Sequence, residues 1–175
     1  NRDTTQLPVD NRFWQPEAYI STTNAYEILP GWSASLAYDF KWNKLNADVY
    51  RFVFPQRKSH FASFATSLER WIIGVQASVL GIFVNDRLRA GSQKNISRFV
   101  PALFLNLRPF FGKTVSFRAF AKQSFRMPTF NDLYYTDVGN AALRPEKATQ
   151  FDIGASFERS FAGFLKNISV QTDVY

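Results

Sequence analysis

The strongest constraint on the fold is a stretch, bounded by Trp32 and Trp42, in which apolar and polar residues alternate. Every second residue from Trp32 onward is apolar or aromatic, and the residues between them are mostly small or polar. A period of two residues is that of a pleated strand, whose successive side chains point to opposite faces. The stretch therefore predicts a strand with one apolar face and one polar face.

The tryptophans at its two ends set the length of the apolar face. Trp32 and Trp42 lie ten residues apart, which corresponds to roughly 33 Å at about 3.3 Å per residue. If the strand is tilted by about 45°, it rises roughly 23 Å, close to the ~25 Å apolar band that aromatic girdles flank in outer-membrane barrels. We therefore predict that this strand crosses a membrane with its tryptophan-bearing face toward lipid.

Hydropathy alone does not separate a soluble β protein from a barrel. The mean hydropathy is −0.22, and no run approaches the ~18 consecutive apolar residues that a membrane-spanning helix needs. Barrel strands escape this test because inward-facing polar residues dilute the lipid-facing ones. The alternating pattern must decide, and it favours the barrel.

Composition narrows the chemistry. The absence of cysteine excludes a disulfide framework and any thiolate metal site. His60 is the single histidine, which leaves almost no scope for histidine-based catalysis or a metal site with several histidines. The net charge of +7 favours anionic partners. We expect no enzymatic activity, no cofactor and no bound metal.

Seven further alternating stretches bring the number of expected strands to eight. They cover residues 18–29, 60–68, 71–84, 99–108, 115–124, 150–158 and 168–174. The short links between them are 30–31, 69–70, 109–113 and 161–166, and the long ones are 43–58, 85–97 and 125–147. Bacterial barrels alternate short periplasmic turns with long extracellular loops, and the weak 60–68 stretch is included because it restores this order. The sequence thus predicts an all-β fold of antiparallel up-and-down strands, a segment of a transmembrane outer-membrane β-barrel.

The polar faces of these strands carry charges of both signs, which suits a water-filled or plugged barrel interior. The residues expected to face inward are Asp39, Lys41, Arg118, Lys122, Gln150, Asp152 and Glu158. The chain starts at Asn1 without a charged and apolar leader, and its last residues resemble a strand that stops without a turn. We expect it to be a piece of a longer protein.

The most specific stretch follows the 115–124 strand. It contains two boxes, Phe125-Arg126-Met127-Pro128 and Asn140-Ala141-Ala142-Leu143, the second followed by Pro145 and Glu146. This arrangement resembles the barrel of TonB-dependent outer-membrane receptors, in which an FRAP-type box closes one strand and an NPDL-type box with a Pro-Glu opens the next. Ala141 and Ala142 depart from the second box.

The resemblance implies a barrel of many more strands around an N-terminal plug, energised by the TonB complex. The plug and the TonB box are not recognisable in these residues. The implied ligand is a scarce small molecule such as a ferric siderophore or a cobalamin-like compound. Haem is less favoured, because haem receptors of this family carry a histidine between the two boxes and this chain has none between Pro128 and Asn140.

The two boxes are expected to shape the junction between strand, loop and strand. Pro128 lacks an N–H donor and stops the ladder, and Glu146 is expected to pair with Arg126 or Arg144. The residues of this structural set are Phe125, Arg126, Pro128, Asn140, Leu143, Pro145 and Glu146.

Candidate ligand contacts lie in the expected long loops and beside them. They are Arg51, Arg57, Lys58, His60, Arg126, Asn131, Tyr134 and Tyr135. The mixture of aromatic and basic residues around Arg51 suits lipopolysaccharide phosphates or an anionic ligand at the outer rim. The same mixture would suit single-stranded nucleic acid, but it does not recur on other strands, so we expect no nucleic-acid partner.

Two other architectures fit parts of the pattern. A self-closing barrel of eight strands, acting as an anchor or adhesin, has the smallest closed strand number. A soluble β-sandwich binding module would use the apolar face as a core. The boxes argue against the first, and the tryptophans at both ends of one strand argue against the second.

Overall fold

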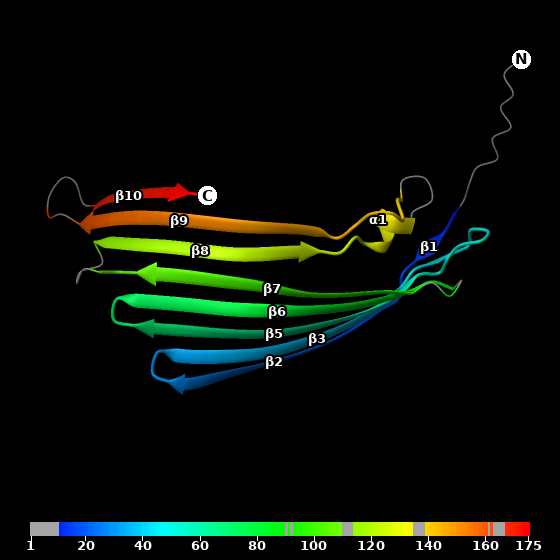
Figure 1. Ribbon diagram of the computed structural model, residues 1–175, viewed down its shortest axis with the longest axis horizontal. Helices are drawn as coiled ribbons and strands as arrows, with labels where there is room; N and C mark the ends of the chain where they lie inside the picture. The colour runs from blue at the N-terminus through cyan, green and yellow to red at the C-terminus, as the bar shows by residue number, and fades with distance from the viewer. Residues whose placement is uncertain are drawn as a thin grey trace, which may run out of the picture.

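The structure is a computed structural model that describes residues 11–89, 91, 93–109, 114–134, 139–160, 162 and 167–175. Eight strands form one antiparallel sheet in the order β10-β9-β8-β7-β6-β5-β3-β2. The strands are β2 (Glu17–Leu29), β3 (Trp32–Lys44), β5 (Gln56–Arg70), β6 (Ile73–Arg87), β7 (Gln93–Leu107), β8 (Val115–Arg126), β9 (Glu146–Ser160) and β10 (Asn167–Val174). Figure 1 shows them as one curved layer with the tight turns at one end. This confirms the predicted all-β, up-and-down order.

The sheet is open. Its edge strands β2 and β10 do not pair with each other in the described part of the chain, so these strands do not form a barrel of eight. The helix of the described residues is α1 (Phe130–Tyr134), and none of them forms a helix that is both long and apolar enough to cross a membrane.

The strand register places the predicted apolar faces on one side of the sheet. Directly opposed residues of an antiparallel pair share a face, and Leu36 lies opposite Asn24 on one side and Phe64 on the other. Phe64 in turn lies opposite Val79, and Val79 lies opposite Pro101 of β7. This row belongs to what we call the outward face. The opposite, inward face includes all seven polar residues predicted to face the interior. One of them, Arg118, forms an ion pair there with Asp173 of β10.

The strands are longer than predicted at the end opposite the tight turns, which we call the loop end. β3 continues to Lys44 and β5 begins at Gln56, so the expected loop 43–58 shortens to 45–55. β6 continues to Arg87 and β7 begins at Gln93, which shortens the expected loop 85–97. The alternation of apolar residues fades there because both faces become polar beyond the apolar band, although backbone pairing continues.

The shortened first loop has structure of its own. Within it, β4 (Asn46–Ala47) pairs with β1 (Phe13–Trp14), so the segment that precedes β2 also lies at the loop end. Leu45, Ala47 and Pro55 are buried there. Part of the expected loop is therefore a small packed unit.

Two tight turns lie at the other end of the sheet, the turn end. The predicted Pro30-Gly31 turn is confirmed between β2 and β3. Gly31 has φ +81°, and a Cβ there would lie 2.4 Å from the carbonyl oxygen of Glu69, so this position requires glycine. The second turn was misplaced by the prediction. Glu69 and Arg70 belong to β5, and the turn is formed by Trp71 and Ile72.

Trp71 therefore leaves the outward row in which it was expected. It has φ +51° and is 94% exposed. The other two predicted links, 109–113 and 161–166, fall almost entirely outside the described residues, and so does any test of them.

The pairing between β7 and β8 stops halfway. It runs from Leu107↔Phe117 to Ala102↔Lys122, and the next residue of β7 is Pro101, which has no N–H donor. By contrast, β6 and β7 pair along their whole length, from Ile73↔Leu107 to Arg87↔Gln93. Figure 1 shows β8 turning toward α1 while β7 follows β6.

Burial in this open sheet is concentrated at the loop end. The buried apolar side chains are Leu45, Ala47, Pro55, Ile82, Val84, Phe130 and Leu133. They come from the first loop, the inward face of β6, and α1, which belongs to the loop carrying the two boxes. This end of the sheet holds the candidate site.

Candidate functional site

The centre of the site is a buried ion pair on the inward face. Arg57 of β5 and Asp86 of β6 are directly opposed in the register. The guanidinium donates from Nε to Oδ1 of Asp86 and from Nη2 to Oδ2, each at 2.7 Å. The two side chains are only 9% and 12% exposed. Such a two-pronged pair fixes the orientation of the guanidinium as well as its position.

The same guanidinium holds the loop that carries the two boxes. Its third nitrogen, Nη1, donates to the carbonyl oxygen of Pro128 at 2.7 Å. Its carbon Cζ lies 5.0 Å from the centre of the Phe130 ring, within the range of a cation–π contact. Arg57 therefore links the wall strands β5 and β6 to the first box, across β7. We call this arrangement of Arg57, Asp86, Pro128 and Phe130 the clamp.

Local sequence shapes the short helix that the clamp holds. Thr129 and Asp132 cap each other: the Thr129 amide donates to Asp132 Oδ2 at 2.8 Å, and the Asp132 amide donates to Thr129 Oγ1 at 3.2 Å. This is the reciprocal arrangement of a capping box. These hydrogen bonds, the backbone one foremost, hold the pKa of Asp132 below its ordinary value of 3.8, and the charge of Arg126 adds to the effect.

The helix places one more candidate side chain, Tyr134, beside the clamp. Burial raises the pKa of Tyr134 above its ordinary value of 10.0, the Asp86 carboxylate raises it further, and Arg57 partly opposes both. A phenol whose pKa is raised above 10.0 keeps its proton over the whole physiological range. Tyr134 is therefore a neutral phenol at this site.

Next to the clamp lies a concavity that we call the lumen hollow. Its lining is basic, polar and apolar, without a carboxylate, and consists of Gln15, Lys41, Asn43, Arg57, Ser59, Phe61, Ile82, Val84, Phe125, Arg126, Met127, Thr129, Phe130 and Asn131. Three of these residues carry a positive charge. The hollow is thus suited to an anionic or oxygen-rich molecule.

Asn43 has an unused polar atom in this lining. The residue is 8% exposed, and among the described residues no hydrogen-bond partner reaches its Oδ1. Buried polar atoms normally have a partner, so a ligand donor would satisfy this atom. Neighbouring Lys41 is held by Glu17 at 2.8 Å.

The base of the loop confirms a predicted pairing. Arg126 Nη1 lies 3.9 Å from Glu146 Oε2, and these two residues are also opposed in the β8–β9 register. Both side chains are more than two-thirds exposed, so the pair is weak. Arg126 remains free enough to turn toward a ligand.

Asn140 shapes the second box. Its side-chain Oδ1 accepts from the Ala142 amide at 2.9 Å, its carbonyl accepts from Leu143, and its own amide donates to the carbonyl of Asp132 at 2.8 Å. These bonds form an Asx turn tied to α1. The second box is therefore tied through the backbone to α1, the helix that follows the first box.

The structure separates the predicted ligand candidates. Arg57, Arg126 and Asn131 line the lumen hollow together, with Tyr134 beside the clamp. Lys58 and His60 lie on the outward face, opposite Trp42 and Phe40. Their predicted role as ligand contacts stays untested.

His60 is part of an outward aromatic cluster. Its Nδ1 is 2.7 Å from the hydroxyl of Tyr38, and its ring centre is 5.0 Å from that of Phe40. Arg51 lies in the exposed first loop with its guanidinium 5.3 Å from the Tyr50 ring. Tyr135 lies outside the described residues, so its predicted role stays a prediction.

Three residues of the site were not predicted as candidates. Lys41 was expected on the inward face only as part of the polar lining, Asn43 was placed at the start of a loop, and Asp86 was placed inside the 85–97 loop. Extending the alternation of β6 by two residues beyond Val84 would have placed Asp86 inward. Only the β5–β6 register identifies it as the partner of Arg57.

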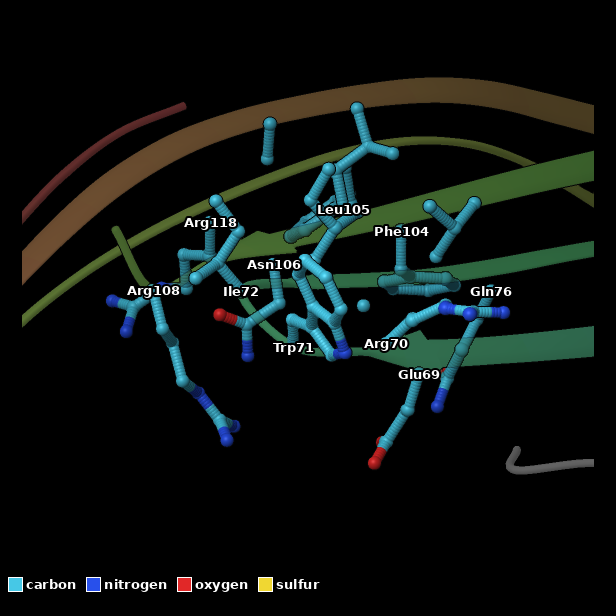
Figure 2. A pocket seen from close by; sticks show the side chains of 15 residues that line it. Glu69, Arg70, Trp71, Ile72, Gln76, Phe104, Leu105, Asn106, Arg108 and Arg118 are labelled. Atoms are coloured by element: carbon cyan, nitrogen blue, oxygen red, sulfur yellow. The ribbon is translucent and has the colours of Figure 1, made fainter. Parts of the chain in front are cut away.

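A second hollow lies at the turn end. Figure 2 shows it with the Trp71 ring near its centre and Arg108, Arg118 and Phe104 around it. Its lining also includes Glu69, so it carries both charge signs. In the described part of the chain, no cluster of three or more histidine, aspartate or glutamate side chains is arranged to hold a metal ion.

Comparison with known proteins agrees with this geometry. The family model described as "TonB dependent receptor-like, beta-barrel" matches residues 3–175. A solved structure of a double mutant of the Serratia marcescens hemophore receptor HasR, in complex with its hemophore HasA and heme, superimposes with a TM-score of 0.63 at 11% identity. The match covers 93% of this chain and 32% of that one, so the chain spans about a third of the receptor's length. No curated protein matches the chain.

Proposed function

The chain belongs to the TonB-dependent receptor β-barrel family, whose members lie in the outer membrane, and on this premise we propose that it forms part of the barrel wall and ligand-entry site of an active transporter. The complete protein would bind a scarce ligand at the loop end and import it with energy from the TonB complex. A plug inside the barrel, contributed by another part of the protein, would contact the inward face. The proposal assigns no catalytic step to these residues.

The lumen hollow is the observation that supports a ligand role. Lys41 and Arg126 bring positive charge, Asn43 offers an unused oxygen, and no carboxylate lines the surface. A ferric siderophore presents oxygen ligands and often a negative charge, which this lining complements. We therefore propose a ferric siderophore, or a cobalamin-like compound of similar size, as the ligand.

Haem is the second candidate because the superimposed receptor is described in complex with heme. That likeness, at 11% identity, concerns the fold alone. A haem iron bound through tyrosine takes a phenolate, whereas burial and Asp86 raise the pKa of Tyr134. The region between the boxes has no histidine. These two observations favour the siderophore.

The proposal can be tested with the complete receptor in a strain that lacks its own copy. Uptake of iron-55 would be measured with a hydroxamate siderophore, a catecholate siderophore and haem, and cobalt-57 cobalamin would be measured in parallel. We expect one siderophore or cobalamin to be imported in a TonB-dependent way. The double variant Arg126→Gln/Asn131→Ala is expected to reduce that uptake about tenfold or more, because it removes a charged and a neutral hydrogen-bonding partner.

Arg70→Gln/Thr22→Ala is the matched control, since it removes one cation and one polar group from the outward face. It should leave uptake unchanged. TonB-dependent growth on haem as the only iron source would overturn the choice of ligand. Normal uptake of the imported ligand by Arg126→Gln/Asn131→Ala would remove the lumen hollow from the binding site.

A further inference from the structure

The outward face of the loop end carries a group of cations that do not line the lumen hollow. In the register, Lys44 lies opposite Gln56, and Gln56 lies opposite Arg87 on its other side. Lys58 lies one row nearer the middle of the sheet, opposite Trp42. Diagonal neighbours across an antiparallel pair have Cβ atoms roughly 7–8 Å apart. Lys58 is such a neighbour of both Lys44 and Arg87, so three cations gather on three adjacent strands.

The surface between these strands is concave. This second concavity of the loop end, which we call the rim hollow, is lined by Lys44, Asn46, Phe54, Gln56, Arg87, Leu88 and Arg89. Its lining has three cations and two amides, and it has no carboxylate. The chemistry of the lining selects for an anion of small size with several acceptor oxygens.

The walls of the rim hollow are fixed by backbone bonds. The Arg89 amide donates to the carbonyl of Val53 at 3.0 Å, and the Leu45 amide donates to the carbonyl of Pro55 at 2.9 Å. The guanidinium of Arg89 lies 5.2 Å from the centre of the Phe54 ring. The first loop and the extension of β6 thus hold each other in place around the concavity.

The three cations of the rim hollow and neighbouring Lys58 have no acidic partner among the described residues. In the described residues, no carboxylate forms an ion pair with Lys44, Lys58, Arg87 or Arg89. Asp86 is the neighbour of Arg87 in sequence, but it points inward and is held by Arg57. Like charges placed together on a sheet repel each other. A bound anion would relieve this repulsion.

The height of the rim hollow identifies the environment of this anion. Trp42 ends the apolar face of β3, and Lys44 lies two residues beyond it, roughly 7 Å farther along the strand at about 3.3 Å per residue. In outer-membrane barrels the aromatic girdle marks the edge of the hydrocarbon. Outward-facing cations just beyond it stand among the lipid headgroups.

We propose that the rim hollow binds a phosphate of lipopolysaccharide, the lipid of the outer leaflet. Arg87 and Arg89 donate to the phosphate oxygens with their guanidinium groups, which suit phosphate geometry, and Lys44 adds a third charge. Lys58 lies one row nearer the middle of the sheet, where it would contact the phosphorylated sugar of the same lipid. The outward aromatic row of Phe40, His60 and Phe83 contacts the acyl chains.

The test uses the complete receptor in phosphatidylcholine nanodiscs doped with bisphosphorylated lipid A. Native mass spectrometry measures how many lipid A molecules stay bound after release from the nanodisc. We expect the unmodified receptor to retain lipid A, and Lys44→Gln/Arg87→Gln to lower retention about tenfold or more. The matched control is Arg70→Gln/Lys147→Gln, which removes one arginine and one lysine from the outward face outside the rim hollow.

Each alternative result decides against the proposal. An equal loss of lipid A retention in the control variant would mean that any outward cation binds lipid A, whether or not it lines the rim hollow. Equal retention of dephosphorylated lipid A would mean that only the acyl chains bind. Displacement of lipid A by inorganic phosphate would identify a site for the free anion. If Lys44→Gln/Arg87→Gln does not assemble, Arg89→Gln alone carries the test, because its side chain is exposed; unchanged retention in that variant overturns the proposal.

Discussion

Arg57 and Lys58 are consecutive residues of β5 with the same charge, yet they have opposite surroundings. Arg57 is buried on the inward face, where Asp86, Pro128 and Phe130 occupy its whole guanidinium. Lys58 is exposed on the outward face, beside Trp42 in the register. The inward environment is made by distant segments of the chain, whereas the outward one is made by the membrane. The alternation of the sequence thus predicts the face on which a side chain lies, whereas its contacts depend on the rest of the fold.

The largest difference between the two faces should appear when each cation is removed. Arg57→Ala leaves the Asp86 carboxylate buried without a partner, which is expected to cost about 3–5 kcal/mol of unfolding free energy. Lys58→Ala in lipid A-free detergent should change it by no more than about 0.5 kcal/mol. Denaturant unfolding of the complete receptor measures both. Equal effects of the two substitutions would contradict the assignment of the faces at the loop end.

The middle of β3 offers the next comparison. Arginine at Leu36, on the outward face, enters the middle of the apolar band and is expected to cost about 2–4 kcal/mol. Arginine at Ser35 faces the interior and should be tolerated much better. The measurement is the folded fraction in isolated outer membranes, scored by the heat-dependent shift of the folded barrel on a gel. Should both variants assemble equally well, lipid does not cover the face of Leu36.

The sequence predicts the outward face of the sheet better than it predicts the strand ends or the contacts of the inward face. The apolar outward residues in the middle of β3, from Trp32 to Trp42, were identified, because hydrocarbon imposes the same requirement on every row. The strand ends were not, because beyond Trp42 both faces are polar and alternation carries no signal. The clamp could not be foreseen, since Arg57 and Pro128 are 71 residues apart and their contact depends on how β8 leaves β7.

The smallest expected effect concerns α1, which lies against the inward face, and the dependence of its capping box on pH. The pKa of Asp132 is depressed, so its contribution to the capping box is present above about pH 3.8 and is lost as the pH falls through the lower, folded-state value. These 175 residues contain no cysteine, so within them a nitroxide label on Asn131→Cys reports α1 alone. We expect label mobility to rise below pH 3.8, while a label on the outward face stays unchanged.

The control for this titration is Asp132→Asn in the labelled protein. The amide oxygen of asparagine still accepts from Thr129 but does not titrate in this range. Label mobility should then be independent of pH. A mobility increase of the same size in the Asp132→Asn protein would show that another acidic group governs α1.

The clamp joins segments that are far apart in the sequence, and this has a consequence for the order in which the structure assembles. Hairpins of neighbouring strands close short loops and form early, whereas the clamp must wait until its distant partners have arrived. Arg57 and Asp86 come together within the β5–β6 hairpin, so one half of the clamp is ready before Pro128 is in reach. The loop that carries the boxes would then join the sheet last, after β5 and β6 have paired. The rate of this last step would depend on closing the 71-residue separation between Arg57 and Pro128.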